Sequence, residues 1–180
     1  DLPDATAADP DWNAPLAMSA VVALTLAGDG VTLPAGLIPL RPDDVAPDLG
    51  GAASTLAWLA ASPPVRMQIV PLAGPAGADF DDVAAACGAR ADRSVARIAD
   101  ETLPRRSTLV PLAASAWLLG VDLLVPEHWS ALPASVDPWH ADLHALPLRW
   151  YVPVTDRSGA DDLPSPWLAP TITVPALDYA

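Results

Sequence analysis

The apolar residues of this chain come in short groups whose spacing changes from one group to the next. Between 19 and 33, Val22, Leu24 and Leu26 alternate with small residues, and the segment 28–30 (Gly-Asp-Gly) then interrupts the pattern. Alternation with a period of two is typical of strands, and glycines supply the positive φ that a tight turn needs. We therefore expect a β-hairpin over 19–33.

Other strands are predicted where short apolar groups lie beside proline or glycine. Because proline has no N–H to donate, it tends to end a strand. The strand at 37–38 is therefore expected to end at Pro39, and the strand at 65–70 is expected to end at Pro71. The remaining strand candidates are 109–110, 121–125, 150–152 and 171–174.

Helical spacing is clearest between Asp79 and Glu101, where Asp79 is a suitable N-cap. On a helical wheel the apolar face contains Val83, Cys87, Ala91, Val95 and Ile98. We expect one helix over this range, with Gly88 as its weakest point. Shorter helices are predicted over 52–61, 111–119 and 137–146.

Strands alternate with helices along the chain, which is typical of the α/β or α+β class. We expect one mixed sheet of roughly four to six short strands with two to four short helices, and a proline-rich extended C-terminal third. A chain of 180 residues suits one hydrophobic core. The predicted organisation is an extended N-terminal arm at 1–18, a single mixed α/β domain at 19–154 and an extended proline-rich tail at 155–180.

The charge of the chain narrows its range of partners. Twenty-two acidic residues face nine basic ones, all of them arginine, which gives a net charge of −13. Such a surface repels nucleic-acid backbones, so we expect no nucleic-acid partner. The longest uncharged runs, 12–28 and 49–65, contain prolines and are shorter than the about 20 apolar residues of a spanning helix. We therefore expect no membrane insertion. The cellular compartment stays unknown.

All three histidines lie in the segment 126–153. On the helix predicted from Asp137, His140 and His144 are four residues apart and point the same way. Two histidines at this spacing can bind the same zinc ion. Glu127 and His128 are candidates for further ligands. On that helix Asp142 lies opposite the histidine pair, whereas on a strand it would join them. The predicted caps favour the helix, so the ligand set is incomplete.

Arginine and cysteine offer two other candidate sites. Arg105 and Arg106 lie outside the predicted helices and can bind a carboxylate or phosphate. Arg93 and Arg97 are expected to pair with nearby acidic residues on a solvated helix face. Cys87 is the only cysteine, which excludes an internal disulfide, and its apolar surroundings favour an inert buried thiol.

Tryptophan is unusually frequent, with seven residues beside a single phenylalanine. Large amphipathic rings are enriched at protein interfaces, and many of these rings lie in a proline-rich part of the chain. The predicted interface residues are Trp129, Trp139, Trp150, Tyr151 and Trp167.

These observations favour a non-enzymatic structural or protein–protein interaction subunit of a larger assembly, such as a particle, an appendage or a multi-subunit complex. Its expected partners are other protein subunits, including copies of itself, and it needs no cofactor. The alternative is a small metal-dependent hydrolase that holds zinc through the histidines of 128–144.

Overall fold

The structure is a computed structural model, and it describes residues 33–42, 49, 52–99, 106–131, 139, 141–155 and 158–176. The arm predicted over 1–18 lies outside the described residues. The hairpin predicted over 19–33 lies outside them as well, except for Leu33.

One mixed sheet of six strands forms the centre of the described part of the chain, which agrees with the predicted α/β class. Its spatial order is β1-β3-β4-β5-β2-β6. All neighbouring strands are parallel except β1, which is antiparallel to β3. The strands are β1 (Leu37–Leu40), β2 (Gln68–Ala73), β3 (Ser94–Ile98), β4 (Val121–Leu124), β5 (Arg149–Val154) and β6 (Ile172–Thr173).

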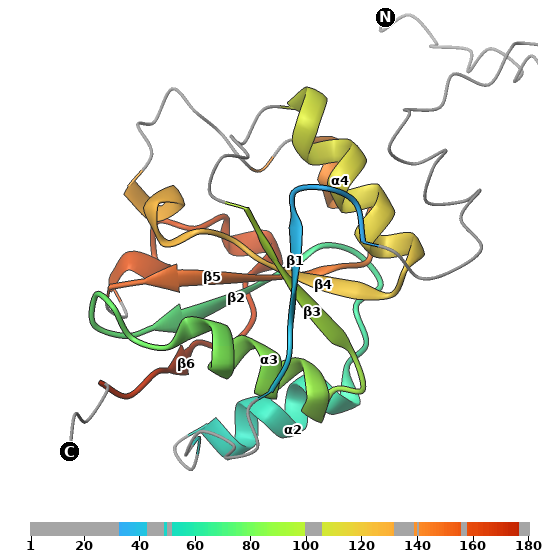
Figure 1. Ribbon diagram of the computed structural model, residues 1–180. Helices are drawn as coiled ribbons and strands as arrows, with labels where there is room; N and C mark the ends of the chain where they lie inside the picture. Colours follow the sequence, from blue (N-terminus) through green and yellow to red (C-terminus); the bar gives the residue numbers. More distant parts are fainter. Residues whose placement is uncertain are drawn as a thin grey trace, which may run out of the picture.

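Helices cover both faces of the sheet, so the molecule has three layers (Figure 1). Two helices, α2 (Ala53–Ala61) and α3 (Phe80–Arg90), pack on one face. The other face carries α4 (Arg106–Leu118) and α5 (Ala141–His144), together with the short 3-10 segment η2 (Glu127–Ala131). Within the described residues, every helix is too short or too polar to cross a membrane.

Strand residues alternate between two hydrophobic clusters because successive side chains point to opposite faces. In β2, Ile69 belongs to the cluster under α4, and Val70 belongs to the cluster under α2 and α3. The same alternation places Trp150 of β5 on the α4 side and Tyr151 on the α2–α3 side. Both faces of the parallel strands are therefore buried, as expected for a sheet between two helical layers.

The long helix predicted from Asp79 to Glu101 is wrong in its second half. Asp79 caps α3 as expected, since its Oδ1 accepts a hydrogen bond from the Asp82 N–H at 3.0 Å. The helix ends at Arg90, the chain turns at Asp92 with a φ of 55°, and β3 follows. Val95 and Ile98 fit the helical wheel, but they lie in β3, and their side chains are buried there.

Three prolines lie inside the described strands: Pro39 in β1, Pro71 in β2 and Pro153 in β5. The predictions that strands would end at Pro39 and at Pro71 are therefore wrong. The carbonyls of Ile69 and Ala73 accept hydrogen bonds from Ala169 and Val174. The backbone groups of alternate residues point to the same edge of a strand. Pro71 therefore faces the β6 side of β2 between these two bonds, where its missing N–H leaves no broken pairing with β5. The strand predicted at 109–110 is also wrong, because both residues lie in α4.

Residues beyond 154 also contribute to the sheet. β6 lies in the range predicted as an extended tail, and Thr173 of this strand pairs with Ala73 of β2. Two short 3-10 segments, η3 (Ser158–Ala160) and η4 (Ser165–Trp167), connect β5 to β6.

Candidate functional site

The strand register brings three charged residues together at the amino ends of β3, β4 and β5. Asp122 of β4 lies beside Arg149 of β5 and beside Val95 of β3, and Arg93 directly precedes β3. The neighbours Leu124, Tyr151 and Val95 point to the α2–α3 side of the sheet. Because residues two apart share a face, the three charged side chains point to that side as well.

Asp122 is the centre of this group. Its side chain is fully buried, and its Oδ1 accepts hydrogen bonds from Arg93 Nη2 at 2.8 Å and Arg93 Nε at 3.3 Å. The backbone N–H of Arg149 donates to the same oxygen at 3.2 Å. A buried carboxylate needs such donors, since an unpaired buried charge costs several kcal/mol, roughly 3–5 when one partner is removed. Asp122 therefore holds the amino ends of three strands in one electrostatic unit.

Arg149 is 1% exposed and connects this unit to α2. Its Nη2 donates to the carbonyls of Leu59 at 2.6 Å and Ser62 at 2.8 Å, which lie in the last turn of α2 and at its C-cap. These carbonyls have no partner within the helix, and the C-terminal end of a helix carries a partial negative charge. Nε of Arg149 donates to Gln68 Oε1 at 3.2 Å, and Nη1 lies 3.9 Å from Asp122 Oδ2.

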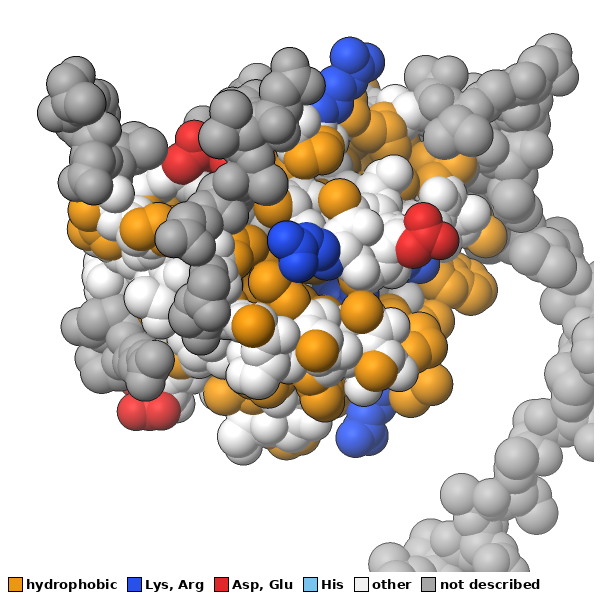
Figure 2. All heavy atoms as spheres, turned by 90° about the horizontal axis from the view of Figure 1, so that it is seen from below, with side chains coloured by type: hydrophobic (Ala, Val, Ile, Leu, Met, Phe, Trp, Pro, Cys, Tyr) orange, Lys and Arg blue, Asp and Glu red, His pale blue; other side chains and the backbone are white. Residues whose placement is uncertain are grey.

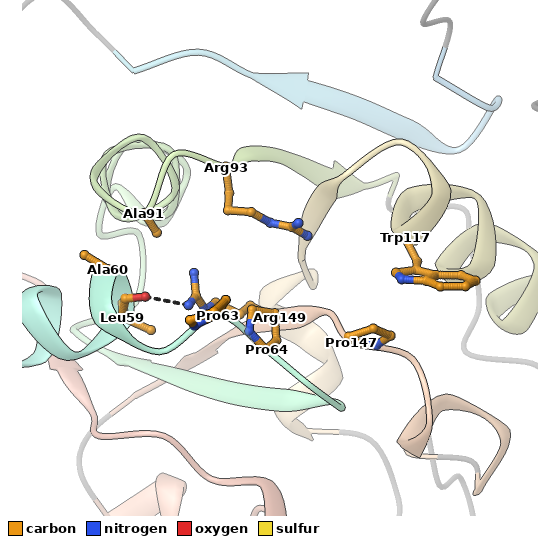
Figure 3. Close-up of a pocket in the computed structure, with 9 residues that line it drawn as sticks. All are labelled: Leu59, Ala60, Pro63, Pro64, Ala91, Arg93, Trp117, Pro147 and Arg149. Carbon is orange, nitrogen blue, oxygen red and sulfur yellow. Dashed lines mark hydrogen bonds between the residues drawn. The ribbon is translucent and has the colours of Figure 1, made fainter.

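Both arginines line a cavity of about 220 Å³, which we call the arginine pocket (Figure 3). In the close-up the two guanidinium groups lie between α2 on one side and the end of α4 on the other. The fully buried Asp122 does not line the pocket. The remaining lining residues are apolar: Leu59, Ala60, Pro63, Pro64, Ala91, Trp117 and Pro147.

The pocket therefore has a positive floor in a strongly acidic protein. Two full positive charges lie against one carboxylate, and none of the described residues that line the cavity is acidic. Arg93 keeps 23% of its side chain exposed, so it can contact a bound group. Trp117 is 44% exposed at the rim and offers an aromatic face beside the cations. This arrangement suits an anion that is attached to an apolar group.

The charges of nearby arginines affect the pKa values of two buried groups, the Cys87 thiol and the Tyr151 hydroxyl. Burial raises the pKa of the Cys87 thiol to about 12, although Arg90 and Arg149 act in the opposite direction. Burial, and then the charge of Asp122, also raise the pKa of the Tyr151 hydroxyl. Both groups stay protonated at neutral pH, so neither adds a negative charge to the site. The buried, protonated thiol agrees with the expectation that Cys87 is inert.

A second hollow lies at the carboxyl ends of the strands, where open α/β sheets commonly bind ligands. It consists of two adjoining cavities of about 430 and 300 Å³ that share Phe80, Glu127, His128 and Pro153. The loop after β2 leads to α3 on one face, and the loop after β4 leads to η2 on the other. We call this hollow the carboxyl-edge crevice.

The charges of the carboxyl-edge crevice are mixed. Arg97 of β3 donates to Asp81 at 2.9 Å, and both side chains are more than a third exposed. Asp79, Glu127 and the exposed His128 are the other ionisable residues among the described ones that line it. Because acidic and basic groups alternate here, the crevice does not favour a ligand of one charge as clearly as the arginine pocket does.

The predicted zinc ligands do not form one cluster among the described residues. Glu127 and His128 lie at the carboxyl end of β2, whereas the carbonyl of His144 bonds to Met67 at the amino end of the same strand. The six residues of β2 separate the two ends by about 20 Å. His144 stacks on Trp167 with ring centroids 3.8 Å apart, and its Nε2 lies 3.0 Å from the Trp139 carbonyl. His140 lies outside the described residues.

The aromatic residues predicted for an interface lie at different depths. Trp129, Trp150 and Tyr151 are core residues with at most 4% exposure, so other parts of the same chain cover them. Trp139 and Trp167 are half-buried, and Trp139 packs edge-to-face on Trp150 at 5.8 Å. The most exposed described tryptophans are two others, Trp117 at 44% and Trp58 at 36%.

The arginines of the arginine pocket, Arg93 and Arg149, are not the pair predicted to bind an anion, Arg105 and Arg106. Arg105 lies outside the described residues, and Arg106 begins α4 with a side chain that the structure does not describe. Arg93 and Arg97 pair with Asp122 and Asp81, not with acidic neighbours on one helix. The arginine pocket does have a signal in the sequence, because Asp122 and Arg149 are single charges within apolar strand segments and a buried charge requires a partner.

Comparison of the sequence with protein-family models and with curated proteins finds no match.

Proposed function

We propose that this protein is a non-enzymatic binding subunit that captures an anionic group of a partner protein in the arginine pocket. One observation carries the proposal: two arginines that share a single buried carboxylate line an open cavity with an otherwise apolar wall. This geometry is built for binding, since the guanidinium groups are held in place before a ligand arrives.

The sign of the charge supports the proposal. The whole chain carries −13, so two arginines gathered in one pocket differ from the average surface. Anionic partners are repelled by most of the surface at long range and are attracted at this pocket, which favours one docking position over others.

The surroundings of the pocket support a protein as the source of the anion. Trp117 and Leu118 at the end of α4 and Val65 in the loop before β2 are exposed apolar residues. The face covered by α2 and α3 also shows hydrophobic side chains over a wide area with a few isolated charges (Figure 2). Arginine and tryptophan are the residue types that most often dominate interface energies.

A titration with short peptides tests the proposal. Three N-acetylated, C-terminally amidated tripeptides carry leucine at both ends and glutamate, phosphoserine or glutamine in the centre. The Trp117 indole resonance, assigned with a Trp117→Phe variant, reports binding at the pocket. We expect at least one of the two anionic peptides to shift this resonance at lower concentration than the glutamine peptide.

Arg93→Gln should weaken the binding of the anionic peptides, and Arg97→Gln is the matched control because it removes an arginine from the opposite end of the same strand. If the glutamine peptide binds as well as both anionic peptides, the proposal is wrong. Equal losses in the two variants would also contradict it, because they would indicate long-range charge and no specific pocket.

The alternative of a zinc-dependent hydrolase stays a prediction. Among the described residues, Glu127 and His128 are the only predicted ligands that line one cavity. A third ligand would have to come from His140 or from another segment outside the described residues. Zinc content measured for the purified protein and for a His128→Ala variant tests this alternative directly.

A further inference from the structure

We infer that the group captured in the arginine pocket is a carboxylate attached to an apolar residue, and not a phosphate. The inference rests on the proposed function and narrows its ligand class. Three features carry it: the net charge of the buried unit, the donors that remain available, and the size and wall of the cavity.

The charge of the unit matches a monoanion. Arg93 and Arg149 contribute two positive charges, and Asp122 cancels one of them. The C-terminal end of α2, which accepts two hydrogen bonds from Arg149, adds a further partial negative charge. The excess that remains is between about half and one positive charge, and a carboxylate comes closer to balancing it than a more highly charged anion does. A phosphate monoester carries nearly two negative charges at neutral pH, so it would leave an uncompensated charge in a partly desolvated site.

The available donors fit two carboxylate oxygens. Nε and Nη2 of Arg93 are used by Asp122, and Nε and Nη2 of Arg149 are used by Gln68 and α2. Nη1 of Arg149 lies 3.9 Å from Asp122 Oδ2, which is beyond hydrogen-bonding distance. Each arginine can therefore offer its Nη1 group, one to each oxygen of a bridging carboxylate.

The cavity sets the size of what is bound. Its volume of about 220 Å³ is below the roughly 300–1,000 Å³ of pockets that enclose drug-sized ligands, so it takes one or two side chains. Trp117, Pro63 and Pro147 provide an apolar wall beside the cations. A carboxylate would lie against the cations, and a neighbouring leucine-like side chain would lie against the apolar wall. The carboxylate can belong to an acidic side chain or to the C-terminus of the partner chain.

Four peptides distinguish these sources by isothermal calorimetry. The glutamate, phosphoserine and glutamine tripeptides described above are joined by acetyl-Leu-Leu with a free C-terminal carboxylate. We expect the better of the two carboxylate peptides to bind at least about 10-fold more tightly than the phosphoserine and glutamine peptides, because charged hydrogen bonds to arginine add affinity that a neutral amide lacks. If the glutamate peptide binds more tightly, the carboxylate belongs to an acidic side chain. If acetyl-Leu-Leu binds more tightly, it belongs to a C-terminus.

Two variants place the binding in the pocket. Arg93→Lys keeps the charge but has a single ammonium group, which cannot bind Asp122 as Nε and Nη2 do and also replace Nη1. It should weaken carboxylate binding, though less than Arg93→Gln, which also removes the charge. Trp117→Ala alters only the exposed rim, which keeps the test valid if an arginine variant fails to fold. It should reduce the affinity of the leucine-flanked carboxylate peptides by about 3-fold or more. Arg97→Gln should leave all four affinities unchanged.

The outcomes separate the inference from the proposed function. If the phosphoserine peptide binds as tightly as the carboxylate peptides, or more tightly, the carboxylate inference is overturned and anion capture stands. Carboxylate binding that is insensitive to Trp117→Ala would overturn the inference that an apolar residue beside the carboxylate packs in the pocket. If neither the carboxylate peptides nor the phosphoserine peptide binds better than the glutamine peptide, the proposed function itself fails.

Discussion

Two ion pairs lie at opposite ends of β3 and have almost the same length. Arg93 contacts Asp122 at 2.8 Å at the amino end, and Arg97 contacts Asp81 at 2.9 Å at the carboxyl end. Their surroundings differ sharply, because Asp122 is fully buried whereas Asp81 and Arg97 are each more than a third exposed. Because the two distances are nearly equal, we expect burial to determine how much each pair contributes.

The difference has a functional side as well. Water competes for the groups of the exposed pair, so this pair contributes about 0–1 kcal/mol and can rearrange easily. At the amino end, each buried group depends on the others, which fixes the arginines in position for a ligand. A rigid cationic floor is thus a by-product of the burial of Asp122.

The largest expected effect is that of Asp122→Asn. This change keeps the shape of the side chain but leaves two arginines without their shared negative charge, so we expect a loss of about 3–5 kcal/mol in the free energy of unfolding. Urea unfolding followed by circular dichroism measures it. A loss no larger than that of Asp81→Asn would contradict the distinction between the two ends of β3.

Gly88→Ala should have the next largest effect. A Cβ at this position would lie 2.4 Å from Val95 Cγ2 and 2.8 Å from the carbonyl of Arg93, so β3 must shift. We expect a destabilisation of about 1–3 kcal/mol in urea unfolding, together with weaker peptide binding because Arg93 moves. Ala89→Ser, at an exposed position of the same helix, should change the stability by less than about 0.5 kcal/mol.

Alkaline pH should destabilise the protein through Cys87, behind the arginine pocket. The thiol ionises near pH 9 in the unfolded chain, whereas burial raises its pKa to about 12 in the folded protein. Between these values the unfolded state releases a proton that the folded state retains, so the free energy of unfolding falls as pH rises, by up to about 1.4 kcal/mol per pH unit. The raised pKa of Tyr151 adds a change in the same direction.

A Cys87→Ala variant separates the two contributions. Urea unfolding at pH 8 and pH 10 should show a smaller decrease for this variant than for the wild type, because only the tyrosine remains. Equal decreases would mean that the thiol ionises as readily in the folded protein as in the unfolded chain.

The smallest expected effect is that of Asp81→Asn at the exposed pair. We expect a change of less than about 1 kcal/mol in urea unfolding, which becomes smaller still at high salt because exposed charges are screened. Peptide binding at the arginine pocket should be unchanged. A loss comparable to that of Asp122→Asn would show that the carboxyl edge is as tightly organised as the amino edge.

The class of the fold could be predicted from the sequence because the signals for single helices and strands are local. The N-cap at Asp79, the helix near 52–61 and the strand near 121–125 all depend on residues a few positions apart. The helix expected to reach Glu101 failed because Val95 and Ile98 fit the helical wheel and a buried strand equally well. The deciding contact, between Gly88 and the chain at Arg93 and Val95, exists only after the chain turns back.

The site was harder to predict than the fold. Arg93, Asp122 and Arg149 are each separated by more than 25 residues and meet only through strand register. Their spacing in the sequence carries no information about this meeting, because strand order is set by packing over the whole sheet. The isolated charges at Asp122 and Arg149 indicate burial, but they do not name the partner.

Among the described strands β1 lies at one edge of the sheet, and this edge limits how another chain can pair with the described part of the protein. The Ala99 N–H bonds to the Gly36 carbonyl, so in the alternation of β1 Ile38 and Leu40 face β3 and Pro39 faces outward. Proline presents no donor there, which blocks the addition of a further strand and protects against aggregation by strand pairing. Self-association or partner binding at this edge would therefore have to use side chains and not a continuous intermolecular sheet.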